Sequence, residues 1–206
     1  MRFFAKLAVA VAVPMLALSP VADAAPIPIV NSGFEDITGQ GPTNEFTFGQ
    51  LAGWGSYDPS LIVAGGNGAN GIFTGTLLPN DTDFFTTPAP EGVRVGLLFG
   101  FGDSAGVGAG EYGYEQTLSS VFQANTQYDL SVEVGNISSG VSQDGTFFDL
   151  SGFPGYRIDL LAGGVVIASD DNSLVIPEGE FATANISFMS GASDALLGLS
   201  LGIPLG

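Results

Sequence analysis

The sequence predicts an all-β protein, an antiparallel β-sandwich of the jelly-roll kind with about eight to ten strands and little helix. Its 31 Gly, 12 Pro and 45% hydrophobic residues suit short strands joined by turns. Apolar and polar residues also alternate in several segments, which is typical of strands with one buried face. The segments predicted as strands are residues 27–34, 46–52, 93–98, 114–118, 128–136, 181–189 and 195–201, with two more strands inside 152–169.

The clearest alternation runs from Tyr128 to Val134, where every second residue is apolar and polar residues lie between. Farther along, Gly163 and Gly164 separate two apolar runs. A Gly-Gly pair in that position predicts a two-residue hairpin turn, because such turns require positive φ angles that glycine adopts without strain.

The N-terminus has the pattern of an export signal. Arg2 and Lys6 precede an apolar run that ends at Leu18, and Ala22-Asp23-Ala24 offers the small-x-small pattern of a cleavage site. The run is shorter than the roughly 20 residues of a membrane-spanning helix, so we expect no membrane insertion. We therefore predict a signal peptide at residues 1–24, a single β-sandwich domain at 25–206, and a secreted or periplasmic protein.

The chain is strongly acidic, with a formal net charge of −17. Removal of residues 1–24 takes away one net positive charge, which leaves about −18 and only Arg94 and Arg157 as basic residues. Such a surface repels phosphate backbones and attracts cations, calcium among them. We expect no nucleic-acid partner.

The chain contains neither Cys nor His. Disulfides are therefore excluded, and so are the usual zinc sites and the Ser-His-Asp and Cys-His arrangements of nucleophilic catalysis. Carboxylates, hydroxyls, amides and aromatic rings remain as the chemical inventory.

An apolar segment enters the turn Asn31-Ser32-Gly33, and Phe34 and Glu35 follow it. This Asn-x-Gly-Phe-Glu pattern resembles the opening strand of carbohydrate-binding-module-like β-sandwiches. In those domains the Glu helps to hold a structural Ca2+ ion, so the resemblance implies Ca2+ as a cofactor and Glu35 as a ligand.

Two later stretches extend the resemblance. A Gln-Thr-Leu strand at residues 116–118 leads through a turn into Tyr128-Asp129-Leu130-Ser131, and residues 152–169 carry the Gly-Gly hairpin. Together the matches look like the secreted family that includes the Stig cyclases, calcium-dependent enzymes that shape hapalindole-type indole alkaloids.

Sandwiches of this type commonly end in a closing strand with an Asp-x-Asp-Asn-like pattern beside the first strand, and the sequence shows no such pattern. Either the chain is truncated and lacks this strand, or Asp194 or an acidic loop replaces its carboxylates at the metal. Without that strand, the edge of residues 27–34 is expected to favour pairing with another copy of the chain, as in a homo-oligomer.

One further stretch, residues 65–73, matches the calcium-binding nonapeptide repeat except that Asn70 replaces the ligand Asp. Such repeats bind calcium only as several stacked copies, so a single copy favours a glycine-rich loop.

Trp54, Tyr57 and Asp58 lie together in a turn-rich loop. An aromatic pair beside a carboxylate can stack on a sugar ring or an indole, which makes Trp54 and Tyr57 the candidate ligand-binding residues. A single Trp in a sandwich is also a common core residue.

The leading hypothesis is a secreted, calcium-stabilised module that binds a carbohydrate or another polyhydroxylated or aromatic ligand. The alternative is a Stig-like cyclase, in which an aromatic pocket folds an isonitrile indole terpene and a protonated carboxylic acid assists its rearrangement and cyclisation. A purely structural exported protein is the third class. A buried carboxylate in an aromatic pocket favours the enzyme, and an exposed aromatic strip favours sugar binding; no catalytic residue is identifiable from the sequence.

Overall fold

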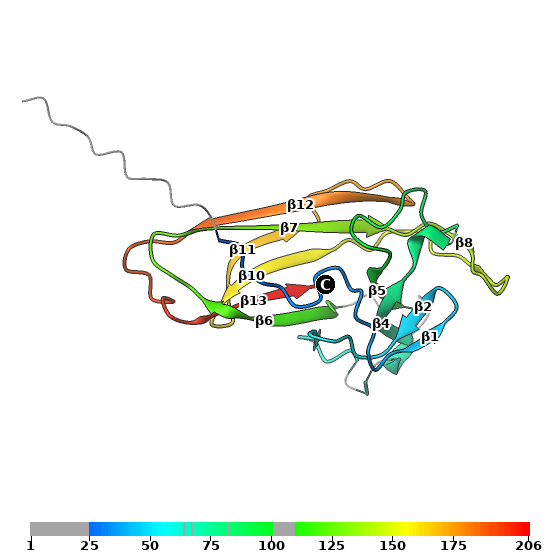
Figure 1. Ribbon diagram of the computed structural model, residues 1–206, viewed down its shortest axis with the longest axis horizontal. Coiled ribbons are helices and arrows are strands. Elements are labelled where there is room, and N and C mark those ends of the chain that lie inside the picture. The colour runs from blue at the N-terminus through cyan, green and yellow to red at the C-terminus, as the bar shows by residue number, and fades with distance from the viewer. Residues whose placement is uncertain (1–24, 64, 67, 82, 101–109) are drawn as a thin grey trace, which may run out of the picture.

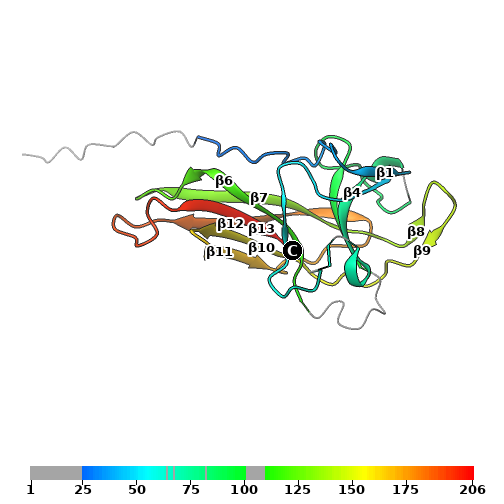
Figure 2. The same ribbon diagram turned by 90° about the horizontal axis from the view of Figure 1, so that it is seen from below.

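A computed structural model describes residues 25–63, 65–66, 68–81, 83–100 and 110–206. Within this part of the chain there are thirteen strands and two 3-10 helices, Ala69–Gly71 and Pro79–Asp81, and no α-helix. The strands pair antiparallel in each sheet (Figures 1 and 2). The predicted all-β sandwich is confirmed. The predicted signal peptide at 1–24 lies outside the described residues.

One layer of the sandwich is a five-stranded sheet in the order β11-β10-β13-β6-β3. Its strands are β3 (Gly55–Tyr57), β6 (Gly113–Val121), β10 (Arg157–Ala162), β11 (Val165–Asp171) and β13 (Ser200–Leu205). The hairpin between β10 and β11 is the predicted one, and its turn residues Gly163 and Gly164 have φ angles of 59° and 81°.

The facing layer consists of β7 (Gln127–Asn136) and β12 (Glu180–Met189), which pair along their whole length (Figure 1). Alternate residues of both strands point inward, as their period-two pattern predicts. The main core between the layers includes Leu118, Leu160 and Ile203 from the five-stranded sheet and Ala184 and Ile186 from β12.

A four-stranded sheet lies at one end of the sandwich, on the right in Figure 1. It contains β1 (Gly41–Thr43), β2 (Phe46–Phe48), β4 (Ile72–Leu77) and β5 (Val95–Gly100). The short hairpin of β8 (Gly140–Val141) and β9 (Phe147–Phe148) extends beyond it (Figure 2).

The two faces of this small sheet have different surroundings. On one face Phe46, Leu77 and Leu97 pack with Phe84 in a second hydrophobic core. On the other face Gly96 leaves room for the Phe34 ring, since a Cβ at Gly96 would lie 2.8 Å from it. Phe34 belongs to the main core, so this second face joins the small sheet to the sandwich.

The prediction of a strand at 27–34 is wrong. None of these residues is in a strand, and Asn31 and Phe34 have φ angles of 51° and 58°, which extended strands do not tolerate. The side chain of Gln116 holds this segment in place of backbone strand pairing. Its Oε1 accepts the Val30 N–H at 2.8 Å, and its Nε2 donates to the Val30 and Gly53 carbonyls at 3.0 and 2.7 Å.

The last predicted strand, 195–201, is also misplaced. Residues 195–198 form a turn, and β13 begins at Ser200 and pairs with both β10 and β6. The final described strand is therefore in the interior of the sheet. Neither the proposed first strand nor its open edge exists as the sequence predicted.

Other differences concern short elements. The strand predicted at 46–52 ends at Phe48, the one predicted at 93–98 spans Val95–Gly100, and β4 begins inside the stretch interpreted as a glycine loop. The strands predicted at 114–118, 128–136 and 181–189 lie within β6, β7 and β12. No helix in the described part of the chain is long and apolar enough to cross a membrane.

Gln116 supplies a test of the contact that holds the N-terminal segment. Gln116→Leu removes three hydrogen bonds and leaves partly buried backbone groups without partners, so the free energy of unfolding should fall by about 2 kcal/mol. Gln123→Leu is the control, because Gln123 is exposed. It should change the free energy of unfolding by less than about 0.5 kcal/mol. Chemical denaturation of both variants measures the difference, and equal midpoints would contradict the assigned role.

Candidate functional site

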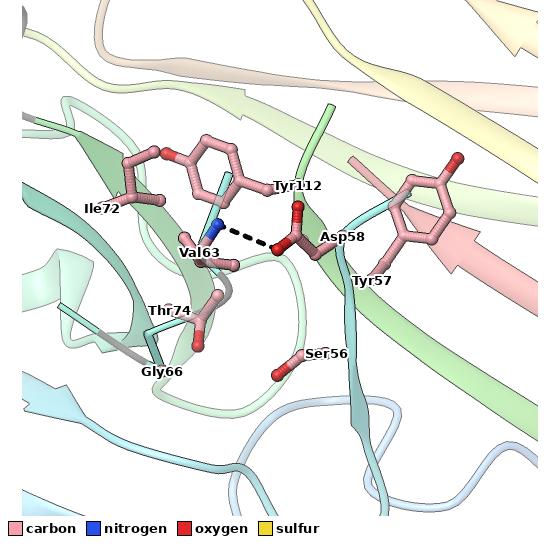
Figure 3. Close-up of a pocket in the computed structure, with 9 residues that line it drawn as sticks. Ser56, Tyr57, Asp58, Val63, Gly66, Ile72, Thr74 and Tyr112 are labelled. Atoms are coloured by element: carbon pink, nitrogen blue, oxygen red, sulfur yellow. Dashed lines mark hydrogen bonds between the residues drawn. The ribbon is translucent and has the colours of Figure 1, made fainter. Parts of the chain in front are cut away.

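A cavity of about 90 Å3 lies between the second face of the small sheet and strands β3 and β6 (Figure 3). We call it the tyrosine cavity. Its walls combine apolar, hydroxyl and carboxylate groups: Ser56, Tyr57, Asp58, Val63, Gly66, Ile72, Thr74, Tyr112 and Gly113.

Tyr112 forms the aromatic wall of this cavity. It immediately precedes β6, two residues before Tyr114, so both rings project to the side of β6 that faces the small sheet. Burial raises the pKa of Tyr112 to about 12. The phenol is therefore neutral at physiological pH, and its hydroxyl is available as a hydrogen-bond donor in the cavity. The sequence analysis missed Tyr112, although the Tyr-x-Tyr spacing before the Gln-Thr-Leu strand was a usable signal.

Asp58 is held rigidly at the opposite wall. Its Oδ1 accepts the Ile62 N–H and its Oδ2 accepts the Val63 N–H, both at 2.8 Å; Figure 3 draws the bond from Val63. The loop from Asp58 to Ile62 contains Leu61, which has a φ of 57°. This left-handed conformation costs energy in a branched residue. Two backbone donors thus fix the position of the carboxylate.

Tyr57 belongs to the cavity wall, but its ring points away from Tyr112 (Figure 3). Its hydroxyl donates to the Glu111 Oε2 at 2.9 Å, and the Arg157 Nη1 lies 3.4 Å from the other oxygen of Glu111. Arg157 also pairs with the buried Asp159 at 3.1 Å. Burial, and then the hydrogen bond to Glu111, raises the pKa of Tyr57 to about 12. Ligand binding by Tyr57 stays a prediction.

Trp54 is not an exposed platform, and that part of the ligand-binding prediction is wrong. Only 5% of the residue is exposed. Its ring stacks on Phe34 with centroids 5.4 Å apart, and its Nε1 donates to the Asn31 carbonyl at 3.1 Å. The indole is thus a core side chain, and the N-terminal turn accepts the hydrogen bond of its one polar atom.

Glu35 fastens the same N-terminal turn to the start of β5. Its Oε1 accepts the backbone N–H groups of Val93 and Arg94 at 2.7 and 2.8 Å. The side chains of Glu35 and Glu91 both approach Gly33, where a Cβ would lie 3.7 Å from the Glu35 Cγ and 3.5 Å from the Glu91 Cδ. Glu91, which the sequence analysis did not single out, is therefore the carboxylate near Glu35.

Asp194 does not lie beside Glu35, which makes its assignment to the same metal site wrong. The loop that contains Asp194 bonds to Phe122 beyond the end of β6, whereas Phe34 packs on Tyr114 near the start of β6. The nine residues of β6 separate these positions by about 25 Å. Asp194 instead accepts the Leu196 N–H at 2.9 Å and caps its own turn.

Within the residues that the structure describes, no group of three or more acidic side chains is placed to hold a metal ion. The glycine-rich stretch 65–73 forms a 3-10 turn at Ala69–Gly71 and then enters β4.

A second hollow of about 120 Å3 lies on the other face of the small sheet. We call it the phenylalanine groove. It lies between β2, β5 and the β8–β9 hairpin, and its lining is mostly aromatic and aliphatic: Thr43, Asn44, Phe46, Phe48, Leu97, Phe99, Ile137, Ser142, Asp144, Phe148 and Leu150.

The two hollows differ in chemistry. The groove carries a carboxylate, Asp144, whose pKa is lowered by hydrogen bonds from Ser142 and Thr146, so it cannot supply a proton at neutral pH. The tyrosine cavity carries a neutral phenol, whose hydroxyl points toward Ile72, and a carboxylate that two backbone donors fix in place (Figure 3). The tyrosine cavity differs from the groove in offering a phenol as its hydrogen-bond donor.

Comparison with protein families identifies the chain. Residues 25–206 match the HpiC1-like family, described as HpiC1 cyclase. The chain belongs to the HpiC1-like cyclase family. The resemblance to Stig cyclases noted in the sequence is thereby confirmed. No curated protein matches the chain.

Solved structures agree with this assignment. A Stig cyclase, Fisc, from Fischerella sp. TAU in complex with (3Z)-3-(1-methyl-2-pyrrolidinylidene)-3H-indole is 36% identical, with a TM-score of 0.75 over 87% of this chain and 86% of that chain. A cyclase from Fischerella sp. TAU in complex with 4-(1H-indol-3-yl)butan-2-one has the same identity and TM-score over 88% and 87%. An apo form cyclase from Fischerella sp. is also 36% identical, with a TM-score of 0.73 over 87% and 85%.

The tyrosine cavity predicts an unusual alkaline titration. Tyr57 and Tyr112 should ionise near pH 12, above the usual value of about 10. Their folded-state pKa is raised, so the stability they contribute is complete below pH 10 and is lost between pH 10 and 12. Ultraviolet titration of phenolate absorbance measures this. Tyr112→Phe and Tyr57→Phe should each remove one late-titrating group; loss of a group that titrates near pH 10 would refute the assignment.

Proposed function

We propose that this protein is a cyclase that acts on an indole-bearing substrate, in the manner of a Stig cyclase acting on an isonitrile indole terpene. The observation that carries the proposal is the family match over residues 25–206, and relatives crystallised with indole ligands support it. Carbohydrate binding has no comparable support, because the ring expected to stack on a sugar, Trp54, is buried.

In this proposal the tyrosine cavity receives the reacting end of the substrate. At about 90 Å3 it is smaller than the ~300–1,000 Å3 of a typical site for a drug-sized ligand, so the remainder of the substrate would lie at the mouth. The apolar walls, Ile72 and Val63, would restrict the bound chain to a folded conformer. Such restriction removes entropy before the reaction and lowers the barrier to rearrangement.

Tyr112 and Asp58 supply the polar chemistry. The neutral Tyr112 hydroxyl donates a hydrogen bond to the ring nitrogen in the imine-type (3H-indole) form of the substrate, which draws electron density toward that atom. The Asp58 carboxylate stabilises the positive charge that develops on carbon during ring closure and accepts the proton that leaves. Substrate and product are isomers, so the proton that Asp58 accepts from carbon is returned to the substrate nitrogen before the product leaves.

Tyr112→Phe tests this role by deleting one oxygen atom. Conversion of an isonitrile indole terpene should fall about 100-fold in kcat, while KM changes little, because the hydroxyl acts in the transition state. Tyr156 lies in the main core with its hydroxyl 3.0 Å from the Asp170 Oδ2. Tyr156→Phe should reduce stability and leave kcat nearly unchanged. Full activity of Tyr112→Phe would reject the assigned donor.

We also propose that Ca2+ stabilises the fold at the Glu35 turn. Two carboxylates, Glu35 and Glu91, lie close together there, and one Glu35 oxygen is already occupied by two backbone donors. A cation between the remaining oxygens would relieve the repulsion between the two side chains. Backbone carbonyls of the turn would have to supply the other ligands.

Thermal melting with Ca2+ and with chelator tests the site. Ca2+ at a hundredfold excess over Kd should raise the free energy of unfolding by about 2.7 kcal/mol if it binds only the folded state. Glu35→Gln and Glu91→Gln should each abolish the shift, and Asp194→Asn, which removes a charge at a distant turn, should leave it intact. Identical melting temperatures with Ca2+ and chelator would reject the metal.

We further propose that the protein is exported and that it pairs with another copy of itself. The signal-like residues 1–24 support a secreted or periplasmic location. β11 is an edge strand of the five-stranded sheet with Val165 and Val166 half exposed, which supports pairing with another copy of the chain.

A further inference from the structure

We propose that the phenylalanine groove is a second ligand site and that it binds an organic ammonium ion with a flat aromatic body, such as an arylalkylamine. The site is separate from the proposed cyclase chemistry, because the β4–β5 layer lies between the groove and the tyrosine cavity. The inference rests on the shape, the aromatic lining and the charge of the groove.

The aromatic walls present both faces and edges. Phe46 stacks on Phe48 with centroids 6.0 Å apart, and the Phe148 ring meets Phe46 at 63° and Phe99 at 81°. Leu97 and Ile137 complete an apolar surface in a hollow of about 120 Å3. A flat ring can enter between such walls, where stacked and edge-on contacts are both favourable.

The alternation of β4 and β5 separates this surface from the tyrosine cavity. Phe73 and Phe99 are paired across the two strands and belong to the groove side, whereas Ile72 and Thr74 line the tyrosine cavity. Neighbouring residues of a strand point to opposite faces, so no side chain of β4 can serve both hollows.

The charge at the groove is entirely negative. Asp144 is the one charged residue among the described residues that line it. The Ser142 hydroxyl donates to Asp144 at 2.5 Å, and so does the Thr146 N–H at 2.9 Å, which holds the carboxylate at the mouth. Next to the lining residues, the fully buried Glu45 accepts the Gln143 N–H at 3.0 Å.

The faces of phenylalanine rings and a carboxylate both attract cations. A ring face carries partial negative charge and stabilises a cation within about 6 Å, and Asp144 adds a direct ion pair. An anionic ligand would be repelled by both and by the net charge of −17 on the chain. The groove therefore selects a cation that also has an apolar surface to bury.

Isothermal titration of the mature protein with three probes of matched ring and different charge tests the proposal. The cation tryptamine should bind about fivefold more tightly than neutral indole, and the anion indole-3-acetate should bind more weakly than indole. Asp144→Asn should reduce tryptamine binding to about the level of indole and leave indole unaffected. Phe148→Leu keeps apolar bulk but removes the ring, and should weaken both by about threefold or more.

Phe147→Ala is the matched control, because Phe147 is 65% exposed beside Phe148 and does not line the groove. Its affinities should equal those of the unaltered protein. Tyr112→Phe separates this inference from the cyclase proposal: it should lose turnover and retain tryptamine binding. Equal affinity for the three probes, or tryptamine binding unchanged in Asp144→Asn, would overturn the ammonium site. Loss of tryptamine binding in Tyr112→Phe would place tryptamine in the tyrosine cavity, and this would also overturn the ammonium site.

Discussion

The hydroxyl of Tyr114 joins the two sheets on which both hollows depend. It lies 2.5 Å from the Gly75 carbonyl and 3.2 Å from the Leu97 carbonyl, on adjacent strands of the small sheet. Tyr114 itself belongs to β6 and is 4% exposed, with Phe34 and Trp54 packed around its ring. In this buried setting a phenol needs a partner, and the two carbonyls of the small sheet supply it, which ties that sheet to β6.

The small sheet also separates the tyrosine cavity from the phenylalanine groove. Its two faces carry different residues because the side chains of a strand alternate, and each face is closed by a different part of the chain. Strand β3, the loop after it and the start of β6 cover the face with Ile72 and Thr74, and the β8–β9 hairpin covers the face with Phe46 and Phe48. Acid–base groups and aromatic surface are thus kept about one sheet thickness apart, and each hollow retains a distinct chemistry.

Much of the sandwich was predictable from the sequence, because period-two alternation in β7 and β12 is decided by burial of one face. The Gly163-Gly164 hairpin was predictable for a local reason, since few other residues adopt two successive positive φ angles. The site was harder to predict. Trp54 lies next to polar residues in the sequence, yet its burial depends on Phe34, a residue twenty positions earlier, and no local pattern reveals that contact. The central place of β13 likewise arises from long-range pairing.

The charge of the chain finally constrains what either hollow can accept. Of the two basic residues outside the predicted signal, Arg157 is committed to Asp159 and Glu111, and Arg94 donates to the Thr76 hydroxyl at 3.1 Å. Both cations therefore serve internal contacts, and neither lines the tyrosine cavity or the phenylalanine groove. A carboxylate or phosphate ligand would meet unbalanced negative charge at each opening, at a cost that grows as the site excludes water. Neutral and cationic aromatic ligands avoid this cost, which is why the same acidic surface is compatible with an indole substrate on one side of the sheet and an ammonium ion on the other.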